Sequence, residues 1–121
     1  MAALPQSDLT PRFRSPLEVF NKEMNAYLVT IDNNQGEVDV DYVHVSKSKK
    51  QEIIWQNNAT DPVTIAFFTS DFTPFDQAVI TVDPGKSEHS GPVTRGIDNA
   101  SYEYAVIGSQ GATDPTVIID K

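Results

Sequence analysis

A hydrophobic period of two, interrupted by a turn signal about every 8–12 residues, recurs along most of this chain. Because successive side chains of a strand point to opposite faces, this period predicts strands with one buried face. Turn sequences such as Asn-Asn-Gln-Gly and Asp-Pro-Gly-Lys would connect the strands. Many short strands with almost no helix predict an all-β sandwich. The predicted strands lie in 26–32, 37–46, 51–56, 63–68, 77–82, 102–108 and 115–120.

The second of these stretches changes its parity. It alternates valine with aspartate up to Asp41, and the alternation then continues on the opposite parity from Val43. One extra residue in one strand of a pair produces such a shift, so a β-bulge is predicted near Tyr42.

Residues 1–25 do not follow the strand pattern. The first part contains two prolines and no hydrophobic period, which indicates an arm. Ser15 can then cap a helix, Pro16 suits its first position, and Glu18 completes the capping box. We therefore expect an N-terminal arm with a short helix at 1–25, followed by a β-sandwich domain at 26–121.

Three apolar residues of the predicted helix, Leu17, Phe20 and Met24, fall on one face. Such a face is expected to be covered, because each exposed large apolar side chain forgoes ~1.5–3 kcal/mol of burial. A second copy of the chain could supply the cover, with Arg12 and Arg14 meeting its acidic C-terminal half. We expect self-association through this segment, with packing on the chain's own sheet as the alternative.

The charge of the chain limits its partners. It has 9 Lys and Arg against 17 Asp and Glu, a net charge of −8, and residues 61–121 contribute 3 − 9 = −6 of that. Such a surface repels nucleic acid and anionic membranes, so neither is expected as a partner. It favours a basic partner, or it serves only solubility. No apolar run approaches the ~18–20 residues of a membrane span.

The compartment stays open. The first residues lack the basic start and long apolar core of a secretory signal peptide. The protein is cytoplasmic if Met1 is the native start, and periplasmic or secreted if this sequence is a mature form. Cysteine is absent, which excludes disulfides, thiolate catalysis and thiolate metal sites.

Neither histidine belongs to a catalytic motif. His44 and His89 are the only possible imidazole bases, and no nucleophile-elbow sequence accompanies them. His89, beside Glu88, is expected to be exposed on a loop or edge strand. We expect no enzymatic activity and no bound cofactor.

Asp39, Asp41 and His44 form the one cluster whose chemistry would suit a metal ion. On a regular strand the two aspartates share a face that His44 does not, although the predicted bulge would bring it back. A dedicated site usually has three or four converging ligands, so a solvated strand face is the alternative.

Four of the six phenylalanines lie within 67–75. Phe68, Phe72 and Phe75 are candidates for an exposed aromatic patch that binds a protein. The simpler explanation is that these rings plug the end of a small sandwich, which needs its aromatic residues in the core.

Two segments resemble a known family. The first has an apolar strand that ends in an aromatic residue and is followed by Asn-Asn and a short loop, and it contains Trp55, Asn57, Asn58 and Pro62. The second has Tyr-x-Tyr, a glycine-containing loop and an apolar final strand, and it contains Tyr102, Tyr104, Gly111 and 116–120. Over about residues 26–120 the chain resembles a plastocyanin-like cupredoxin. The resemblance implies a Greek-key β-sandwich.

The copper ligands of that family are missing from the resemblance. Its first His, Cys, second His and Met fall at Val63, Val106, Ser109 and near Asp114. A blue-copper site needs two imidazoles, a thiolate and a weak axial ligand, so one-electron transfer does not carry over. Val63 and Val106 are expected to fill the vacated space with apolar volume.

These observations favour a copper-free cupredoxin-like domain that acts as a non-catalytic protein-binding or assembly module. The alternative is a protein that binds a metal or small molecule weakly through Asp39, Asp41 and His44.

Overall fold

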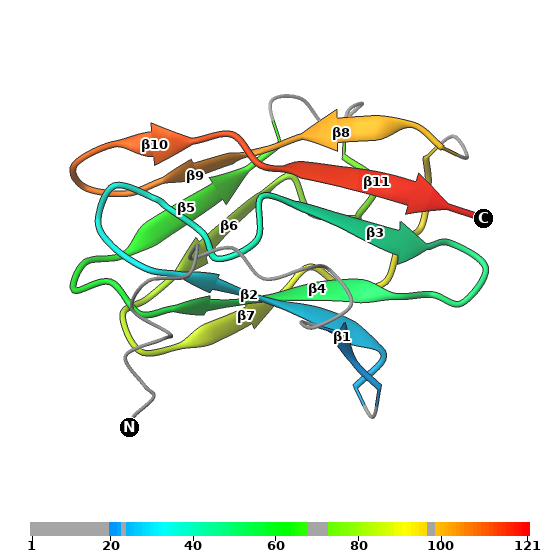
Figure 1. The fold of residues 1–121 in the computed structure, drawn as a ribbon, viewed down its shortest axis with the longest axis horizontal. Coiled ribbons are helices and arrows are strands. Elements are labelled where there is room, and N and C mark those ends of the chain that lie inside the picture. The colour runs from blue at the N-terminus through cyan, green and yellow to red at the C-terminus, as the bar shows by residue number, and fades with distance from the viewer. Residues whose placement is uncertain (1–19, 23, 68–72, 97–98) are drawn as a thin grey trace, which may run out of the picture.

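The computed structural model describes residues 20–22, 24–67, 73–96 and 99–121, which form an all-β sandwich without a helix in these ranges (Figure 1). The strands are β1 (Phe20–Asn21), β2 (Ala26–Ile31), β3 (Tyr42–Ser46), β4 (Glu52–Asn57), β5 (Val63–Ala66), β6 (Val79–Val82), β7 (Ser87–His89), β8 (Ser101–Glu103), β9 (Ala105–Ile107), β10 (Ala112–Thr113) and β11 (Thr116–Asp120).

The strands form two layers. Layer A is the sheet β1-β2-β4-β7, and layer B combines the sheets β3-β11-β8 and β10-β9-β5-β6. β8 and β9 belong to one stretch of chain that is interrupted at Tyr104, whose backbone N–H donates to the carbonyl of Pro115 at 3.0 Å. The two sheets of layer B are therefore continuous with each other.

Strand order differs from chain order, as the Greek-key prediction requires. β2 pairs in parallel with β4, and β3 pairs in parallel with β11, while the other pairs are antiparallel. β2 and β3 follow each other in the chain but lie in different layers. The segment 32–41 connects them across one end of the sandwich.

The shift in parity within 37–46 is real, but a bulge near Tyr42 does not produce it. Val38 forms an isolated bridge with Ile31, and the chain then leaves strand geometry over 39–41 before β3 begins. The valines on both sides of this break are buried. The break lies where the chain passes from layer A to layer B. It changes which alternate side chains face the core.

The predicted helix at 15–24 lies mostly outside the described residues. Phe20 and Asn21, which are described, form β1 and pair with Tyr27 and Ala26. At these two residues the helix prediction is wrong. The ring of Phe20 packs on Tyr27 with centroids 4.7 Å apart, so pairing at the sheet edge outweighs the local capping signal.

A chain of aromatic rings crosses the core. Trp55 from β4 contacts Tyr104 at a centroid distance of 5.6 Å, Tyr104 contacts Phe67 at 5.3 Å, and Phe67 contacts Phe75 at 5.7 Å. All four side chains are buried. These rings fill the space between the layers.

Candidate functional site

The structure separates the three residues of the predicted metal cluster. On β3, Nδ1 of His44 lies 3.0 Å from the carboxylate of Asp120 on β11. Asp39 is buried, and its carboxylate accepts the backbone N–H of Thr30 at 2.8 Å. Asp41 is exposed. In the described ranges no group of three or more His, Asp or Glu side chains is placed to hold a metal ion.

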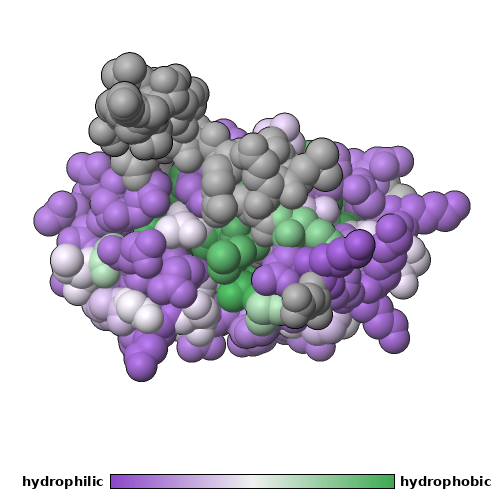
Figure 2. Space-filling model, turned by 60° about the horizontal axis from the view of Figure 1, so that its bottom comes forward, coloured by the Kyte–Doolittle hydropathy of each residue, from purple (hydrophilic) through white to green (hydrophobic). Residues whose placement is uncertain are grey.

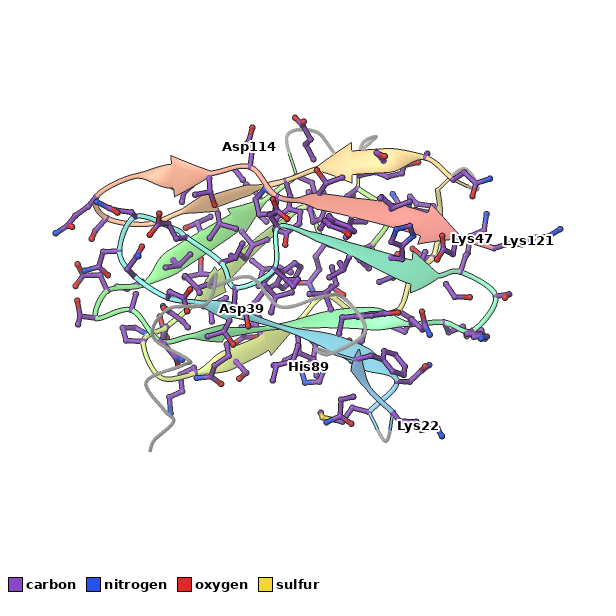
Figure 3. All side chains as sticks on the ribbon, viewed as in Figure 1. Lys22, Asp39, Lys47, His89, Asp114 and Lys121 are labelled. Carbon is purple, nitrogen blue, oxygen red and sulfur yellow. The ribbon has the colours of Figure 1, made fainter. Side chains whose placement is uncertain are left out.

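His89 lies on β7, the edge strand of layer A, and is exposed as expected. Its Nδ1 is 3.3 Å from the carboxylate of Glu52 on β4. Figure 3 shows His89 on the opposite side of the molecule from Asp114. In the described ranges this histidine therefore contacts a carboxylate at a sheet edge.

Of the three aromatic candidates, Phe75 lies within the described residues. Phe75 is fully buried and packs on Phe67, so it plugs the sandwich and cannot contribute to an exposed patch. Phe68 and Phe72 lie outside the described residues.

Two of the four positions expected to correspond to copper ligands are filled by valine. Val63 on β5 and Val106 on β9 are both completely buried. Val106 pairs with Ile65, which lies two residues from Val63 on the same inner face, so the two valines are diagonal neighbours on adjacent strands. Their side chains occupy the interior at the end of the sandwich, as close packing requires.

The other two positions are polar and exposed. The hydroxyl of Ser109 donates to the carboxylate of Asp61 at 2.7 Å, which joins the loop after β9 to the loop before β5. Asp114 points away from the β10–β11 connection (Figure 3). It lines a pocket of about 290 Å³, whose walls are Glu37, Val38, Asp41, Thr113, Asp114, Pro115 and Thr116.

Asn34 holds the loops at this end together. Its side-chain amide donates to Thr60 at 2.8 Å and accepts the N–H of Asp61 at 3.1 Å. Its backbone carbonyl accepts the N–H of Gln110 at 2.9 Å. The turn after β2 is thereby fixed to both neighbouring loops.

Two glycines permit backbone contact at the same place. A Cβ on Gly108 would lie 2.0 Å from the carbonyl oxygen of Asn34, and one on Gly36 would lie 2.2 Å from that of Val106. Only glycine allows backbones to approach this closely. The loop end is therefore closed by direct contact between 33–36 and 108–111.

No protein-family model matches this chain. Among solved structures, it is similar to the reduced auracyanin of Roseiflexus castenholzii, with a TM-score of 0.54 and 11% identity over 80% of this chain and 98% of that one. It is also similar to a purple cupredoxin from Nitrosopumilus maritimus, with a TM-score of 0.53 and 11% identity over 77% of this chain and 98% of that one. The chain has the cupredoxin fold.

One curated protein shares sequence with this cupredoxin-fold domain. It is sphingomyelinase C 2 of Leptospira interrogans, which is 29% identical over 113 residues. The match covers 87% of this chain but 18% of the leptospiral protein. The domain therefore spans less than a fifth of the length of that relative.

This cupredoxin-fold domain lacks the copper site. Valine side chains offer no donor atom, and the chain contains no cysteine to supply the thiolate of a blue-copper centre. In the described part of the chain no other ligand group replaces them. The donor set does not fit copper, although the surrounding fold is complete.

One surface of the cupredoxin-fold domain has no counterpart among the sequence predictions. The outer face of β10-β9-β5-β6 carries no charged side chain; its positions are Thr64, Ala66, Val79, Thr81, Ala105, Ile107 and Ala112, of which Ala105 is buried. Val79 is 61% exposed and Ile107 is 43% exposed. We call these seven residues the uncharged face. The signal was present in the sequence, since 63–66, 79–82 and 105–107 contain no charge at either parity.

The outer face of layer A differs. Figure 2 views the molecule from that side and shows a hydrophobic area surrounded by hydrophilic side chains. Ala26 and Ile54 belong to strands of this layer but not to the core cluster, and their exposed fractions are only 0% and 5%. Ala26 and Ile54 are thus far less exposed than Val79 and Ile107.

Proposed function

We propose that this domain is a copper-free, non-catalytic module that works by binding a protein partner. The observation that carries the proposal is that buried valines occupy two of the positions expected for copper ligands in an intact fold. Val63 and Val106 complete the core where a redox centre would need imidazole and thiolate. What remains for such a domain to use is its surface.

The surface supports this proposal. Contiguous exposed apolar patches commonly mark contact sites. The uncharged face includes two exposed apolar side chains, Val79 and Ile107, on a chain with a net charge of −8. The two described histidines engage carboxylates at exposed positions. The proposal therefore includes no reaction step.

The leptospiral match supports a modular role. A domain that spans 18% of a relative can be one unit of a longer protein, with the named activity belonging to that relative. We propose that this domain serves likewise as a binding unit, alone or beside other domains.

The proposal is tested by quantitative binding. The purified chain, immobilised in EDTA, is used to capture proteins from its source organism, and each captured protein is then purified and titrated by calorimetry. Saturable binding of at least one protein at a fixed stoichiometry is expected without metal. The proposal is overturned if no captured protein binds saturably, or if binding needs a metal ion.

A second candidate is weak binding of a small cationic molecule. The pocket of about 290 Å³ has three acidic residues, Glu37, Asp41 and Asp114, in its lining. This pocket replaces the cluster expected from the sequence, because His44 is engaged by Asp120 instead. A rise in the thermal midpoint with added polyamine, lost in Asp41→Asn, would support it by mass action. An unchanged midpoint would remove it.

A further inference from the structure

The uncharged face adjoins an open strand edge. In the described part of the chain β6 is the last strand of its sheet, with β5 on one side and no strand paired on the other. Layer A also ends in two edge strands. These are the two-residue β1 and the polar β7, whose sequence is Ser-Glu-His. β6 has the sequence Val-Ile-Thr-Val, without the charge or proline that usually protects an edge.

Backbone geometry shows which groups of β6 face outward. The carbonyl of Ala78 accepts the N–H of Phe67 at 2.7 Å, and Ile80 pairs with Ile65. In an antiparallel pair, alternate residues direct both backbone groups to the neighbouring strand. Val79 and Thr81 therefore direct theirs to the open edge. The same two residues place their side chains on the uncharged face.

Charge decides what can approach this edge. Asp76 and Asp83 flank β6 at its two ends, and both are exposed. Of the nearby cations, Arg95 already pairs with Asp76 at 3.3 Å. The half of the chain that contains this face carries a net charge of −6. A second copy would bring carboxylates against carboxylates, whereas a basic partner would meet opposite charge.

We infer that β6 binds an extended segment of a partner protein, in which apolar side chains alternate with basic ones. The segment adds a strand to layer B through the backbone groups of Val79 and Thr81. Its apolar side chains contact the uncharged face, and its basic side chains lie near Asp76 and Asp83. This inference rests on the proposed function, since it names the site and the partner chemistry of that module.

The test uses a defined probe. A short peptide of alternating valine and lysine with blocked ends is titrated into the isotope-labelled full chain, and amide shifts are recorded by NMR. The matched peptide has glutamate in place of lysine. The valine–lysine peptide is expected to shift Val79, Thr81 and Ala66 saturably, and added salt is expected to weaken it.

Two variants and one control locate the site. Val79→Pro removes a donor at the open edge without removing a bond to β5, and Val79→Lys places a like charge against the peptide. Each is expected to weaken binding by about tenfold or more. Tyr42→Lys is the control, because Tyr42 is also an exposed hydrophobic residue but lies on β3, at the other end of layer B. It is expected to leave the affinity unchanged.

The remaining outcomes separate this inference from the proposed function. Equal binding of the glutamate peptide, or shifts confined to another face, overturns the inference. The inference is also overturned if the Val79→Pro variant has a lower molecular mass in solution than the wild type. Such a result would mean that a second copy of the chain occupies β6 in the wild type. If a captured protein binds the wild type and Val79→Lys equally, the site is wrong while the proposed function stands. If the peptide binds at β6 but no protein does, the proposed function fails instead.

Discussion

The indole N–H of Trp55 donates to the hydroxyl of Tyr104 at 3.3 Å and thereby joins layer A to layer B through the core. Both side chains are buried, with 0% and 1% of their surface exposed. In the described part of the chain every buried side-chain nitrogen and oxygen has a hydrogen-bond partner. Loss of one member of this pair would leave the other without a partner and without access to water.

Tyr104→Phe is therefore expected to destabilise the fold. The substitution keeps the ring contacts but leaves the indole N–H of Trp55 unsatisfied, which costs about 1–3 kcal/mol. Urea unfolding followed by Trp55 fluorescence measures the change. Tyr42→Phe, at an exposed position, is the matched control and is expected to stay within about 0.5 kcal/mol of the wild type. Equal stability of the two variants would contradict the role of this bond.

Stability is also expected to fall at alkaline pH because of Tyr104. Burial raises the pKa of its hydroxyl well above the ordinary value of 10.0; the hydrogen bond from Trp55 acts in the opposite direction, and Asp39 and Asp41 raise the pKa further. Above pH 10 the unfolded chain loses this proton while the folded chain keeps it, so rising pH favours unfolding. Below pH 10 the contribution is constant.

The Tyr104→Phe variant isolates this effect. Between about pH 10 and pH 11 the free energy of unfolding of the wild type should fall faster than that of the variant, by up to ~1.4 kcal/mol per pH unit. Urea midpoints at a series of pH values measure both slopes. Parallel curves would mean that Tyr104 does not titrate differently in the two states.

Copper should not bind at the loop end. Added Cu(II) is expected to give no intense visible band, because neither Val63 nor Val106 offers a ligand. The combined variant Val63→His, Val106→Cys, Ser109→His restores the imidazoles and the thiolate, and is expected to produce such a band. Absorption spectroscopy measures both. A colourless combined variant that remains folded would show that these positions do not correspond to the copper ligands.

Close contact between the two loops predicts unequal effects of two similar substitutions. Gly108→Ala would place a Cβ 2.0 Å from the carbonyl oxygen of Asn34, whereas in Gly111→Ala the nearest atoms lie 3.5 Å away. Neither residue has a positive φ, so the comparison reports space alone. Gly108→Ala is expected to cost about 1–3 kcal/mol and Gly111→Ala much less. Thermal unfolding that ranks them in reverse order would contradict the closed loop end.

Self-association through the N-terminal segment remains a proposal. Removal of residues 1–19 spares β1 and its contact with Tyr27, so the sandwich keeps its edge. Light scattering is expected to show fewer chains per particle for the truncated protein than for the full chain. A full chain that is already monomeric contradicts the proposal. An unchanged oligomeric mass after truncation would show that another surface holds the copies together.

Much of the fold could be predicted because the strands of the sandwich follow a local alternation of apolar and polar residues. Strands such as β5, β6 and β11 alternate buried and more exposed residues, and period two identifies them without any knowledge of partners. β1 could not be found in this way. It has only two residues. Its strand conformation depends on the pairing of Phe20 with Tyr27 and on the contact between their rings.

The candidate site was harder to predict, because sites depend on pairing between distant strands. The proximity of Asp39, Asp41 and His44 in sequence suggested a cluster, but β3 pairs with β11, which brings Asp120 to His44. The uncharged face consists of strands far apart in the chain, and only their register places Ile107 beside Thr64. Residue types alone could predict the missing copper ligands, since cysteine is absent throughout.

The parallel pairing of β3 with β11 has a consequence for synthesis of the chain. On the ribosome, β2 meets β4 soon after both emerge, but among the described strands β3 pairs only with β11, which is made much later. Val43 and Val45 lack their cover for as long as β11 is missing. Pairings between distant segments are slow to form, and an unpaired strand edge invites aggregation. A chain that stops before β11 would therefore be an aggregation-prone fragment rather than a shortened domain.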